Sequence, residues 1–421
     1  MPTTALIDYG CHSFTFRLAS HLQTQGFAMS YVANGSLESP NLKSLPDWES
    51  RYPDLIRIVH SKKPYGKLSL RDRMSGEIDW ASRCIEMLEA EPPSAIVASC
   101  LPITVVAKVQ SWARRRHIPF VYWLQDLQGI AIAELLGKRL GHAGHVFGWL
   151  AKNLELAFLR RSNHVITIAY AHEEFLPAQI RNTGRFTTLE NWANIEDIPR
   201  LPRENDWSIR RRLDNTVNIV YSGTLGFKHD LKVFPALAAA FRDRPNVRIV
   251  VVSSGAAADF LAAEASRSAL NNLIVLPFQP YEELPAVLAS AAVLIAPLDP
   301  SAGSFCVPSK VLSYLCAGRP SVLAIDGANP AAQMIESAGG GVTVRPGNTE
   351  GLVEAVRRLI DDPLARDQMG QAARAYAEAT FSVENVSKRF LRILETAGIR
   401  AVGARPASPA ATSIALDCDG N

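Results

Sequence analysis

The fold class is decided by a stretch in the middle of the chain, VNIVYSGTLGFKH at residues 217–229. It begins with a mostly apolar, β-branched run, which is typical of a strand covered on both faces. Two glycines, Gly223 and Gly226, then mark a turn, and a helical pattern follows from Asp230. A buried strand, a glycine turn and a helix together form one βα unit of a parallel sheet.

The same unit repeats in both directions along the chain. In the second half, strands are expected at Val217–Tyr221, Arg248–Ser253, Leu273–Leu276, Val293–Ala296, Ser321–Ile325 and Gly341–Val344. In the first half, they are expected at Ala5–Asp8, Phe27–Ala33, Leu55–His60, Ala95–Cys100, Phe120–Gln125 and His164–Ala171. Helical patterns separate these runs, among them Ser13–Thr24, Ala143–Ser162 and Thr349–Asp361. The predicted fold class is therefore α/β, with two Rossmann-like domains facing each other across an interdomain cleft.

The repeats also suggest where the domains begin and end. We expect an N-terminal domain over residues 1–197, a linker rich in Pro and Arg over 198–215, and a C-terminal domain over 216–380. A last helix over 381–398 is expected to pack back on the N-terminal domain, and the tail over 399–421 is expected to be disordered. In such sheets ligands bind at the carboxyl ends of the strands, so the chemistry should lie in the strand-to-helix loops.

Composition limits the class of protein. Of the 421 residues, 48% are hydrophobic, which is enough for a core in each domain, and the formal net charge of +3 is too small to indicate nucleic acid. The six cysteines form no CxxC pair, so neither a zinc site nor a disulfide framework is predicted. The sequence predicts neither a signal peptide nor a membrane-spanning helix, which would need a run of about 18 apolar residues. A cytoplasmic protein is therefore expected.

Two strand-to-helix junctions have the chemistry of phosphate binding. In the first, Ser222, Gly223 and Thr224 offer backbone groups to an anion, and Lys228 adds positive charge. In the second, the helix that begins at Ser309 and Lys310 points its positive end at the preceding loop, and Ser309 is expected to cap it. The alternatives are an ordinary turn with a solvated lysine and a packed core helix with one extended lysine.

A third turn lies between these two junctions. Gln279 and Tyr281 stand where a strand ends and a helix begins, a position at which a nucleobase edge could be read. Hydrophobic packing explains the same residues equally well.

Taken together, these motifs resemble the donor domain of family 4 retaining glycosyltransferases, and most of all the branch that builds colanic-acid-type exopolysaccharides and O-antigens. The resemblance is strongest over about residues 218–362 and weaker over 122–197. It rests on five motifs: Gln279-Pro280-Tyr281 with Leu284-Pro285, the Leu294–Leu298 strand, Pro308-Ser309-Lys310 with Ala317-Gly318-Arg319-Pro320, Ser222-Gly223-x-Leu225-Gly226-x-Lys228, and Asn191-Trp192.

This resemblance implies a GT-B fold and a metal-independent transfer of a sugar from a nucleotide-diphosphate donor to a glycan acceptor, with a polyprenol-linked acceptor expected. Lys228 and Lys310 would contact the donor phosphates beside Ser309 and Gly223 and stabilise the leaving charge. The acceptor hydroxyl would attack from the same face, and the leaving phosphate would take its proton. No cofactor and no metal are expected apart from the nucleotide sugar as co-substrate.

Several positions depart from the family pattern. Phe305 and Ser313 stand where many members carry two glutamates, so Ser313 is left as the acceptor for a ribose hydroxyl. Gln125 stands where many members carry a histidine, which leaves Asp126 as the catalytic candidate on the acceptor side, with a helix cap as its alternative. The turn after the first strand retains Gly10 for close approach to a ligand, and His12 beside it is expected to be a surface residue.

Two other readings stay open. One is a non-catalytic nucleotide-sugar-binding or scaffolding relative, since the Glu and His positions differ. The other is a different GT-B enzyme such as a sugar-nucleotide epimerase, which would need acid–base carboxylates in the cleft. The stretch from Lys138 to Arg161 mixes basic and large apolar residues, which favours peripheral contact with an anionic membrane or an ordinary packed helix.

Overall fold

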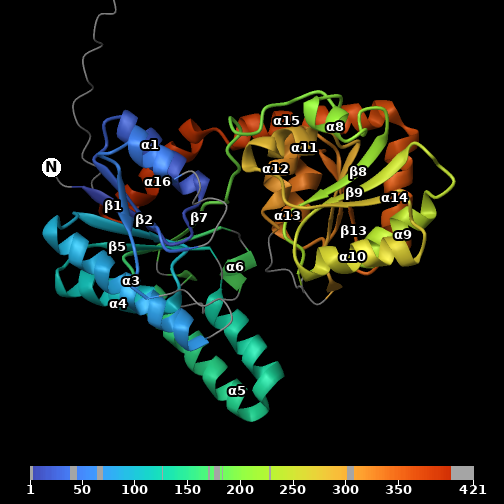
Figure 1. Ribbon diagram of the computed structural model, residues 1–421. Helices are drawn as coiled ribbons and strands as arrows, with labels where there is room; N and C mark the ends of the chain where they lie inside the picture. The colour runs from blue at the N-terminus through green and yellow to red at the C-terminus, as the bar shows by residue number, and fades with distance from the viewer. Residues whose placement is uncertain are drawn as a thin grey trace, which may run out of the picture. The chain divides into compact units, whose positions relative to one another are not determined.

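A computed structural model gives the fold of the chain. It describes residues 3–37, 45–63, 70–125, 127–168, 171–174, 181–182, 184–226, 229–300 and 308–399. The chain forms two compact units (Figure 1). Unit 1 contains residues up to 166, residues 182–187 and, of the described residues after the second sheet, 387–399. Unit 2 contains residues 167–181 and 188–386.

Unit 1 is built on a seven-stranded sheet in the order β3-β2-β1-β4-β5-β6-β7. The pairs β1–β2, β1–β4, β2–β3 and β4–β5 are parallel. Its strands are β1 (Thr4–Asp8), β2 (Met29–Asn34), β3 (Ile56–Val59), β4 (Ala95–Ser99), β5 (Phe120–Leu124), β6 (His164–Thr167) and β7 (Phe186–Thr188). β1, β4 and β5 are buried along their whole length, as their continuous apolar runs predict.

Helices cover both faces of this sheet (Figure 1). They are α1 (Ser13–Thr24), α2 (Leu45–Arg51), α3 (Leu70–Ala90), α4 (Ile103–Arg115), α5 (Gln128–Arg161) and α16 (Val383–Thr396). The short helix α6 (Ala171–Glu174) belongs to unit 2. α16 comes from the end of the described chain, and its fully buried Phe390 lies 5.6 Å from the Trp123 ring of β5, measured between ring centroids. An aromatic pair thus ties the last helix to the core of unit 1.

Unit 2 is built on a six-stranded sheet in the order β10-β9-β8-β11-β12-β13, and each of its pairs is parallel. The strands are β8 (Val217–Ser222), β9 (Val247–Val252), β10 (Leu273–Leu276), β11 (Val293–Pro297), β12 (Ser321–Ala324) and β13 (Gly341–Val344). One layer of helices holds α9 (Val233–Ala240), α10 (Ala256–Arg267) and α14 (Thr349–Asp361), and the other holds α8 (Asp206–Arg210), α11 (Leu284–Ala289), α12 (Lys310–Ala317), α13 (Pro330–Ser337) and α15 (Pro363–Thr380) (Figure 1). The turn η2 (Tyr281–Glu283) leads into α11.

The strand-helix alternation that the sequence predicts is therefore present in both units, and the α/β fold class is confirmed. One difference lies in residues 198–215, which contain the short helix α8. Asn205 and Ser208 form a capping box at its start, and Trp207 beside them is 1% exposed. A cap and a buried indole fix this segment on unit 2, whereas its Pro and Arg content suggested only a linker.

Candidate functional site

The site in unit 2 begins at the point where the strand order reverses. β8 and β11 are neighbours, with β9 and β10 on one side of them and β12 and β13 on the other. Open parallel sheets bind ligands outside the carboxyl ends of the two strands at such a reversal. The residues that follow β8 and β11 are therefore the first place to look for chemistry in this unit.

Two side chains, Tyr221 and His229, contact the ammonium group of Lys310 there. Its Nζ lies 2.9 Å from the Oη of Tyr221, near the end of β8, and 3.1 Å from the Nε2 of His229. His229 is held beside the end of β11 by an isolated bridge to Leu298. The Tyr221 hydroxyl donates in turn to the carbonyl of Thr224 at 2.7 Å, so it is free to accept from the ammonium. We call Tyr221, His229 and Lys310 the Lys310 cluster.

The cluster is electrostatically well defined. Burial, and then the neighbouring Tyr314, raise the pKa of Tyr221 above its usual range, so the phenol stays neutral and can serve as the hydrogen-bond relay. Nζ of Lys310 also lies 4.6 Å from the centroid of the Tyr221 ring, which adds a cation–π attraction. The result is a fixed positive charge at the carboxyl end of β8.

Gly223 lies close to the side chain of the same lysine. Its φ of +142° lies in a region that side chains rarely adopt, and a Cβ built there would lie 3.1 Å from Cε of Lys310. Gly226, three residues later, would place a Cβ in open space. The first of the two glycines predicted to approach a phosphate is therefore needed beside the ammonium, while the second has no such steric requirement.

The start of α12 brings Lys310 to this point. Pro308 is buried, Ser309 is exposed, and Lys310 is the first residue of the helix. Ser309 has helical backbone angles and its hydroxyl makes no capping bond, so the expectation that it caps the helix is wrong. Its hydroxyl instead lies exposed at the positive end of the helix. Ser313, one turn further, is half-buried on the same helix.

The structure gives the other predicted residues of unit 2 different environments. Ser222 is half-buried at the end of β8 and Thr224 is exposed beyond Gly223. Tyr281 is 41% exposed at the start of η2. The amide of Gln279 is already engaged, because its Oε1 accepts from Trp207 at 3.2 Å and from Arg211, and its Nε2 donates to the carbonyl of Pro277 at 2.7 Å. Their predicted roles toward the base and ribose stay predictions.

Unit 1 carries a second polar cluster where its own strand order reverses, between β1 and β4. The carboxylate of Asp8, which ends β1, is fully buried. It accepts hydrogen bonds from the backbone of Gly10 at 3.0 Å, from the backbone and Nδ1 of His12 at 2.7 and 3.0 Å, from Tyr31 Oη at 3.0 Å and from Thr15. Nε2 of His12 faces the Sγ of Cys100, just after β4, at 3.9 Å. Asp8, His12 and Cys100 are the Asp8 cluster.

Asp8 favours the protonated, charged form of His12. Burial lowers the pKa of His12, but the carboxylate of Asp8 outweighs it, and the pKa lies well above the usual 6.5. For Asp8, burial acts to raise the pKa, yet the charge and hydrogen bonds of His12 and Thr15 bring it below 3.8. Burial raises the pKa of the Cys100 thiol, with His12 opposing it. The His12 side chain is 36% exposed, as expected of a surface residue, but its ring is oriented by a buried carboxylate.

The Asp8 cluster is also the one group of side chains in the described part of the chain with the spacing of a metal site, since its ligand atoms lie within 4.8 Å of one another. Both oxygens of Asp8 already accept from protein donors. The carboxylate is therefore suited to orienting His12 rather than to ligating an ion. Cys100 has a φ of +54°, a strained conformation that often occurs at functional turns.

Two predicted catalytic residues, Asp126 and Lys228, lie outside the described residues, as does Phe305. Gly10 lies in unit 1, beside the Asp8 cluster, and the remaining predicted binding residues lie in unit 2. Sequence reasoning missed Asp8, Cys100, Tyr221 and His229 as functional side chains. The position of Asp8 and Tyr221 at the ends of buried strands was the available signal, since a polar group there must be hydrogen-bonded and faces the ligand edge of the sheet.

Comparison with known proteins agrees with this geometry. Residues 216–362, which include the whole Lys310 cluster, match the family model described as glycosyl transferases group 1. The "Putative colanic acid biosynthesis glycosyl transferase WcaI" of Escherichia coli is 28% identical over 273 residues, which cover 63% of this chain and 65% of that protein. These matches support a family 4-like glycosyltransferase of the GT-B type. This assignment confirms the family resemblance, and it rests mainly on unit 2.

Other relatives extend the likeness beyond this unit. The GDP-mannose-dependent monoacylated alpha-(1-6)-phosphatidylinositol monomannoside mannosyltransferase of Corynebacterium glutamicum is 26% identical, over 67% of this chain and 78% of that protein. The structure of Anabaena Alr3699/HepE in complex with UDP-glucose superposes with a TM-score of 0.69 at 15% identity, covering 94% of this chain and 100% of that one. WaaG, a glycosyltransferase involved in lipopolysaccharide biosynthesis, gives a TM-score of 0.63 at 14% identity, covering 93% of this chain and 99% of that one. Both structures share the GT-B fold.

Proposed function

We propose that the chain transfers a sugar from a nucleoside-diphosphate donor, bound at the Lys310 cluster, to a glycan acceptor. The observation that carries the proposal is the ammonium of Lys310, fixed by Tyr221 and His229 beside Gly223 at the strand reversal of unit 2. Positive charge, a helix N-terminus and a glycine without a side chain are what a diphosphate needs from a protein. The matched family residues include this cluster.

In the proposed mechanism, the ammonium of Lys310 and the N-terminus of α12 stabilise the diphosphate charge that grows as the sugar–phosphate bond breaks. Tyr221 holds the ammonium in place, and Ser309 offers a hydroxyl beside it. Lys228 is proposed as a second phosphate contact. We propose a retaining, metal-independent transfer in which the leaving phosphate takes the proton of the attacking hydroxyl. Asp126 is proposed for the acceptor side.

The proposed acceptor is a lipid-linked glycan of the kind used in exopolysaccharide or O-antigen synthesis. The names of two relatives, a colanic acid biosynthesis protein and a phosphatidylinositol mannoside mannosyltransferase, support this class. α5 supports a membrane contact, because it exposes a row of large apolar side chains near its basic end: Val146, Phe147, Trp149, Leu150 and Leu154, each 44–63% exposed. Such a row beside Arg160 and Arg161 suits the surface of an anionic bilayer. In the described part of the chain, no helix is long and apolar enough to cross a membrane.

A panel of nucleoside diphosphates tests the donor site first. One member should raise the melting temperature selectively, because a ligand that binds only the folded state stabilises it. The matching nucleotide sugar should then be consumed with a polyprenol-linked glycan, and the anomeric configuration of the product, read by NMR, decides between retention and inversion. If no diphosphate stabilises the protein, the donor site is wrong. Binding without turnover across donors and acceptors would favour the non-catalytic relative.

Co-sedimentation with vesicles tests the membrane contact. Vesicles that contain phosphatidylglycerol should retain the wild-type protein, and Trp149→Ser should reduce the bound fraction several-fold because the indole no longer inserts at the interface. Phe260→Ser is the matched control, since Phe260 is 53% exposed on α10 in unit 2. Equal losses in both variants would argue against a specific contact through α5.

A further inference from the structure

A second cationic hollow lies at the opposite end of α12 from Lys310. It is small and partly open to solvent. Four arginines and one aspartate supply its charged side chains, together with backbone at Gly318 and Gly370: Arg200, Arg203, Arg319, Arg366 and Asp367. α12 has eight residues, so its two ends are separated by about 12 Å. The hollow is therefore distinct from the Lys310 cluster, although one helix joins them.

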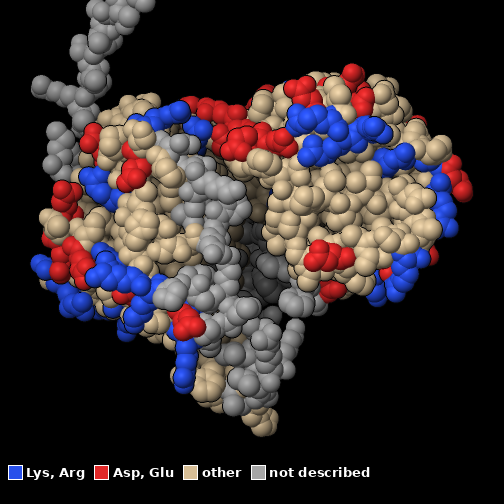
Figure 2. Space-filling model, viewed as in Figure 1, with Lys and Arg blue, Asp and Glu red and all other residues tan. Residues whose placement is uncertain are grey.

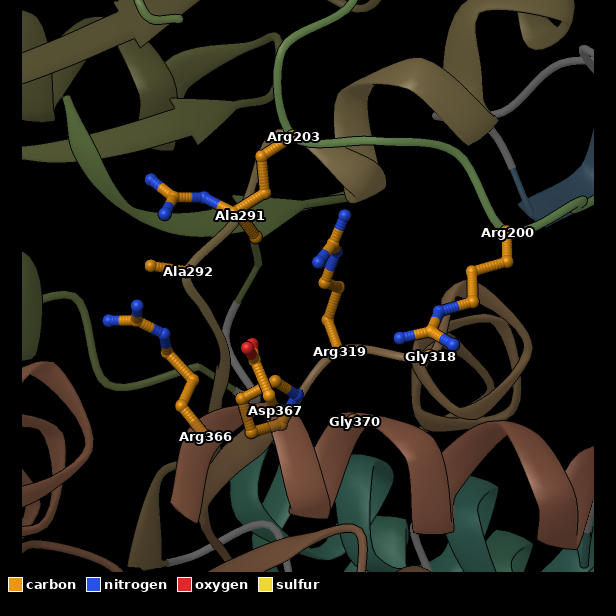
Figure 3. A pocket seen from close by; sticks show the side chains of 10 residues that line it. Arg200, Arg203, Ala291, Ala292, Gly318, Arg319, Arg366, Asp367 and Gly370 are labelled. Atoms are coloured by element: carbon orange, nitrogen blue, oxygen red, sulfur yellow. The ribbon is translucent and has the colours of Figure 1, made fainter. Parts of the chain in front are cut away.

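The arginines converge from three segments that are far apart in the sequence. Arg200 and Arg203 come from the segment before α8, Arg319 from the turn between α12 and β12, and Arg366 from the first turn of α15. Figure 3 shows Arg366 rising from α15 and Arg319 in the middle, with the guanidinium groups of Arg203 and Arg200 on either side of Arg319. α12 and α15 approach closely here, because a Cβ on Gly370 would lie 2.6 Å from the carbonyl oxygen of Gly318.

The hollow carries a net positive charge, which Asp367 offsets only in part. Four arginines and one aspartate give the hollow a formal charge of 4 − 1 = +3. Within the described ranges, no carboxylate lies within the 4.0 Å of an ion pair from any of these four guanidinium groups. Burial, followed by the like charges of Arg203 and Arg200, lowers the pKa of Arg319 to about 10. Burial and the charge of Arg366 likewise lower the pKa of Arg203.

Two of the guanidinium groups also keep buried donors unused. Arg203 donates to the carbonyl of Thr216 at 2.5 Å and Arg319 to that of Leu201 at 2.8 Å, which fixes both heads. The Nε–H of each is nevertheless buried without a hydrogen-bond partner. A buried donor on a charged group is costly to leave unpaired, so both positions favour an acceptor from outside the chain.

Other arginines of unit 2 differ from these four because they pair with carboxylates of the fold. Figure 2 shows basic side chains gathered over α8, where Arg210 and Arg211 approach Glu283 at 2.6 and 4.0 Å. Arg374, next to the hollow on α15, donates to the carbonyl of Cys316 at 2.7 Å and pairs with Glu378 at the same distance. These arginines are satisfied within the fold, whereas the four around the hollow are not.

We propose that this hollow binds a phosphoryl oxyanion, such as inorganic phosphate, diphosphate or the phosphate of a larger molecule. Guanidinium groups match the geometry of phosphate oxygens and keep their charge when half-buried. Arg203, Arg319 and Arg366 are half-buried and Arg200 is exposed at the edge of this small space, which favours a single phosphate-sized group that enters from solvent. The site does not depend on the proposed transferase activity.

Calorimetric titration of the full chain with inorganic phosphate and with diphosphate tests the proposal at constant ionic strength, with chloride as the compensating anion. All titrations use a Lys310→Ala background, so that anion binding at the donor cluster does not contribute. Arg366→Ala and Arg200→Ala should each raise the dissociation constant about tenfold or more, because each removes charge-assisted hydrogen bonds to the anion. Neither side chain hydrogen-bonds to another group in the described part of the chain.

Arg358→Ala is the matched control, since Arg358 is exposed on α14 and removes the same charge outside the hollow. It should leave the affinity unchanged. Equal weakening in Arg358→Ala and Arg366→Ala would overturn the site in favour of general electrostatic attraction. Vesicles of phosphatidylcholine with and without phosphatidylglycerol distinguish the source of the phosphate. If free phosphate does not bind but Arg366→Ala loses binding to the vesicles, the site is assigned to a lipid headgroup. If neither the free anions nor the vesicles bind, the proposal is overturned.

Discussion

The two sheets of this protein carry different chemistry at the same topological position. In unit 2, the reversal between β8 and β11 holds the ammonium of Lys310 between a neutral phenol and an imidazole. In unit 1, the reversal between β1 and β4 holds a buried carboxylate that is saturated with hydrogen bonds and orients His12 toward a thiol. One cluster presents a net positive charge, while the other presents a balanced ion pair. The same position in the two sheets thus differs in charge, with an ammonium group in unit 2 and a buried carboxylate paired with a histidine in unit 1.

The largest expected effect comes from removing the charge in unit 2. Lys310→Ala should lower turnover about 10²- to 10³-fold, because one preorganised electrostatic contact to a developing charge is worth that much. Lys310→Arg should restore part of the rate. Lys232→Ala, which removes an exposed lysine at the start of α9, should leave turnover near wild type. Comparable rates for Lys310→Ala and Lys232→Ala would remove the phosphate role from the unit 2 cluster.

The matching change in unit 1 should affect stability first. Asp8→Asn leaves His12, Tyr31 and Thr15 around a group that no longer carries charge, and we expect it to lower the free energy of unfolding by about 3 kcal/mol. Asp54→Asn, at an exposed position after α2, serves as the control. Urea denaturation measures both. A loss below about 0.5 kcal/mol for Asp8→Asn, the range of ordinary surface substitutions, would mean that the ion pair does not organise this site.

The pH dependence of that loss follows from the pKa shifts. The folded pKa of Asp8 lies below 3.8, so its contribution is present above that value and is lost as the pH falls through the folded pKa. The folded pKa of His12 lies above 6.5, so its contribution is present below 6.5 and is lost as the pH rises through the folded pKa. The difference in unfolding free energy between wild type and Asp8→Asn should therefore be largest from about pH 4 to pH 6.5. A difference that grows above pH 8 would contradict the ion pair.

A smaller effect should separate the two glycines of the phosphate turn. Gly223→Ala places a methyl group against the Lys310 side chain at a positive φ, so we expect a stability loss of about 1–2 kcal/mol together with reduced turnover. At Gly226 the same substitution meets open space and should be nearly neutral. Thermal denaturation and turnover of the two variants provide the comparison, and equal behaviour would show that Lys310 does not need the space at Gly223.

The smallest effect concerns the relay within the Lys310 cluster. Tyr221→Phe keeps the ring under the ammonium but removes the bonds to Lys310 and to the carbonyl of Thr224, so turnover should fall only a few-fold, about 1 kcal/mol. Tyr376→Phe removes a phenol elsewhere in unit 2 and serves as the control. A loss as large as that of Lys310→Ala would make Tyr221 a direct participant rather than a positioning residue.

Much of the fold could be predicted because strand and helix periods are local. α1 and α14 begin and end at the residues that their patterns predict, and the strands of unit 2 agree within one or two residues. α5 is longer than expected, beginning at Gln128 instead of Ala143. β7 and α8 could not be found, because a three-residue edge strand has too few residues to show a period, and α8 depends on a buried tryptophan and a capping box.

For the site, the sequence by itself determined the βα repeat, the glycine turn at Gly223 and the helix start at Lys310, because each is written in neighbouring residues. Those motifs also carry the resemblance to family 4 retaining glycosyltransferases. Only the tertiary structure decided which side chains meet: Lys310 with Tyr221 across 89 positions, His12 with Cys100 across 88, and the four arginines at the far end of α12. Such meetings depend on strand order and helix packing, which join distant segments and leave no periodic trace in the chain.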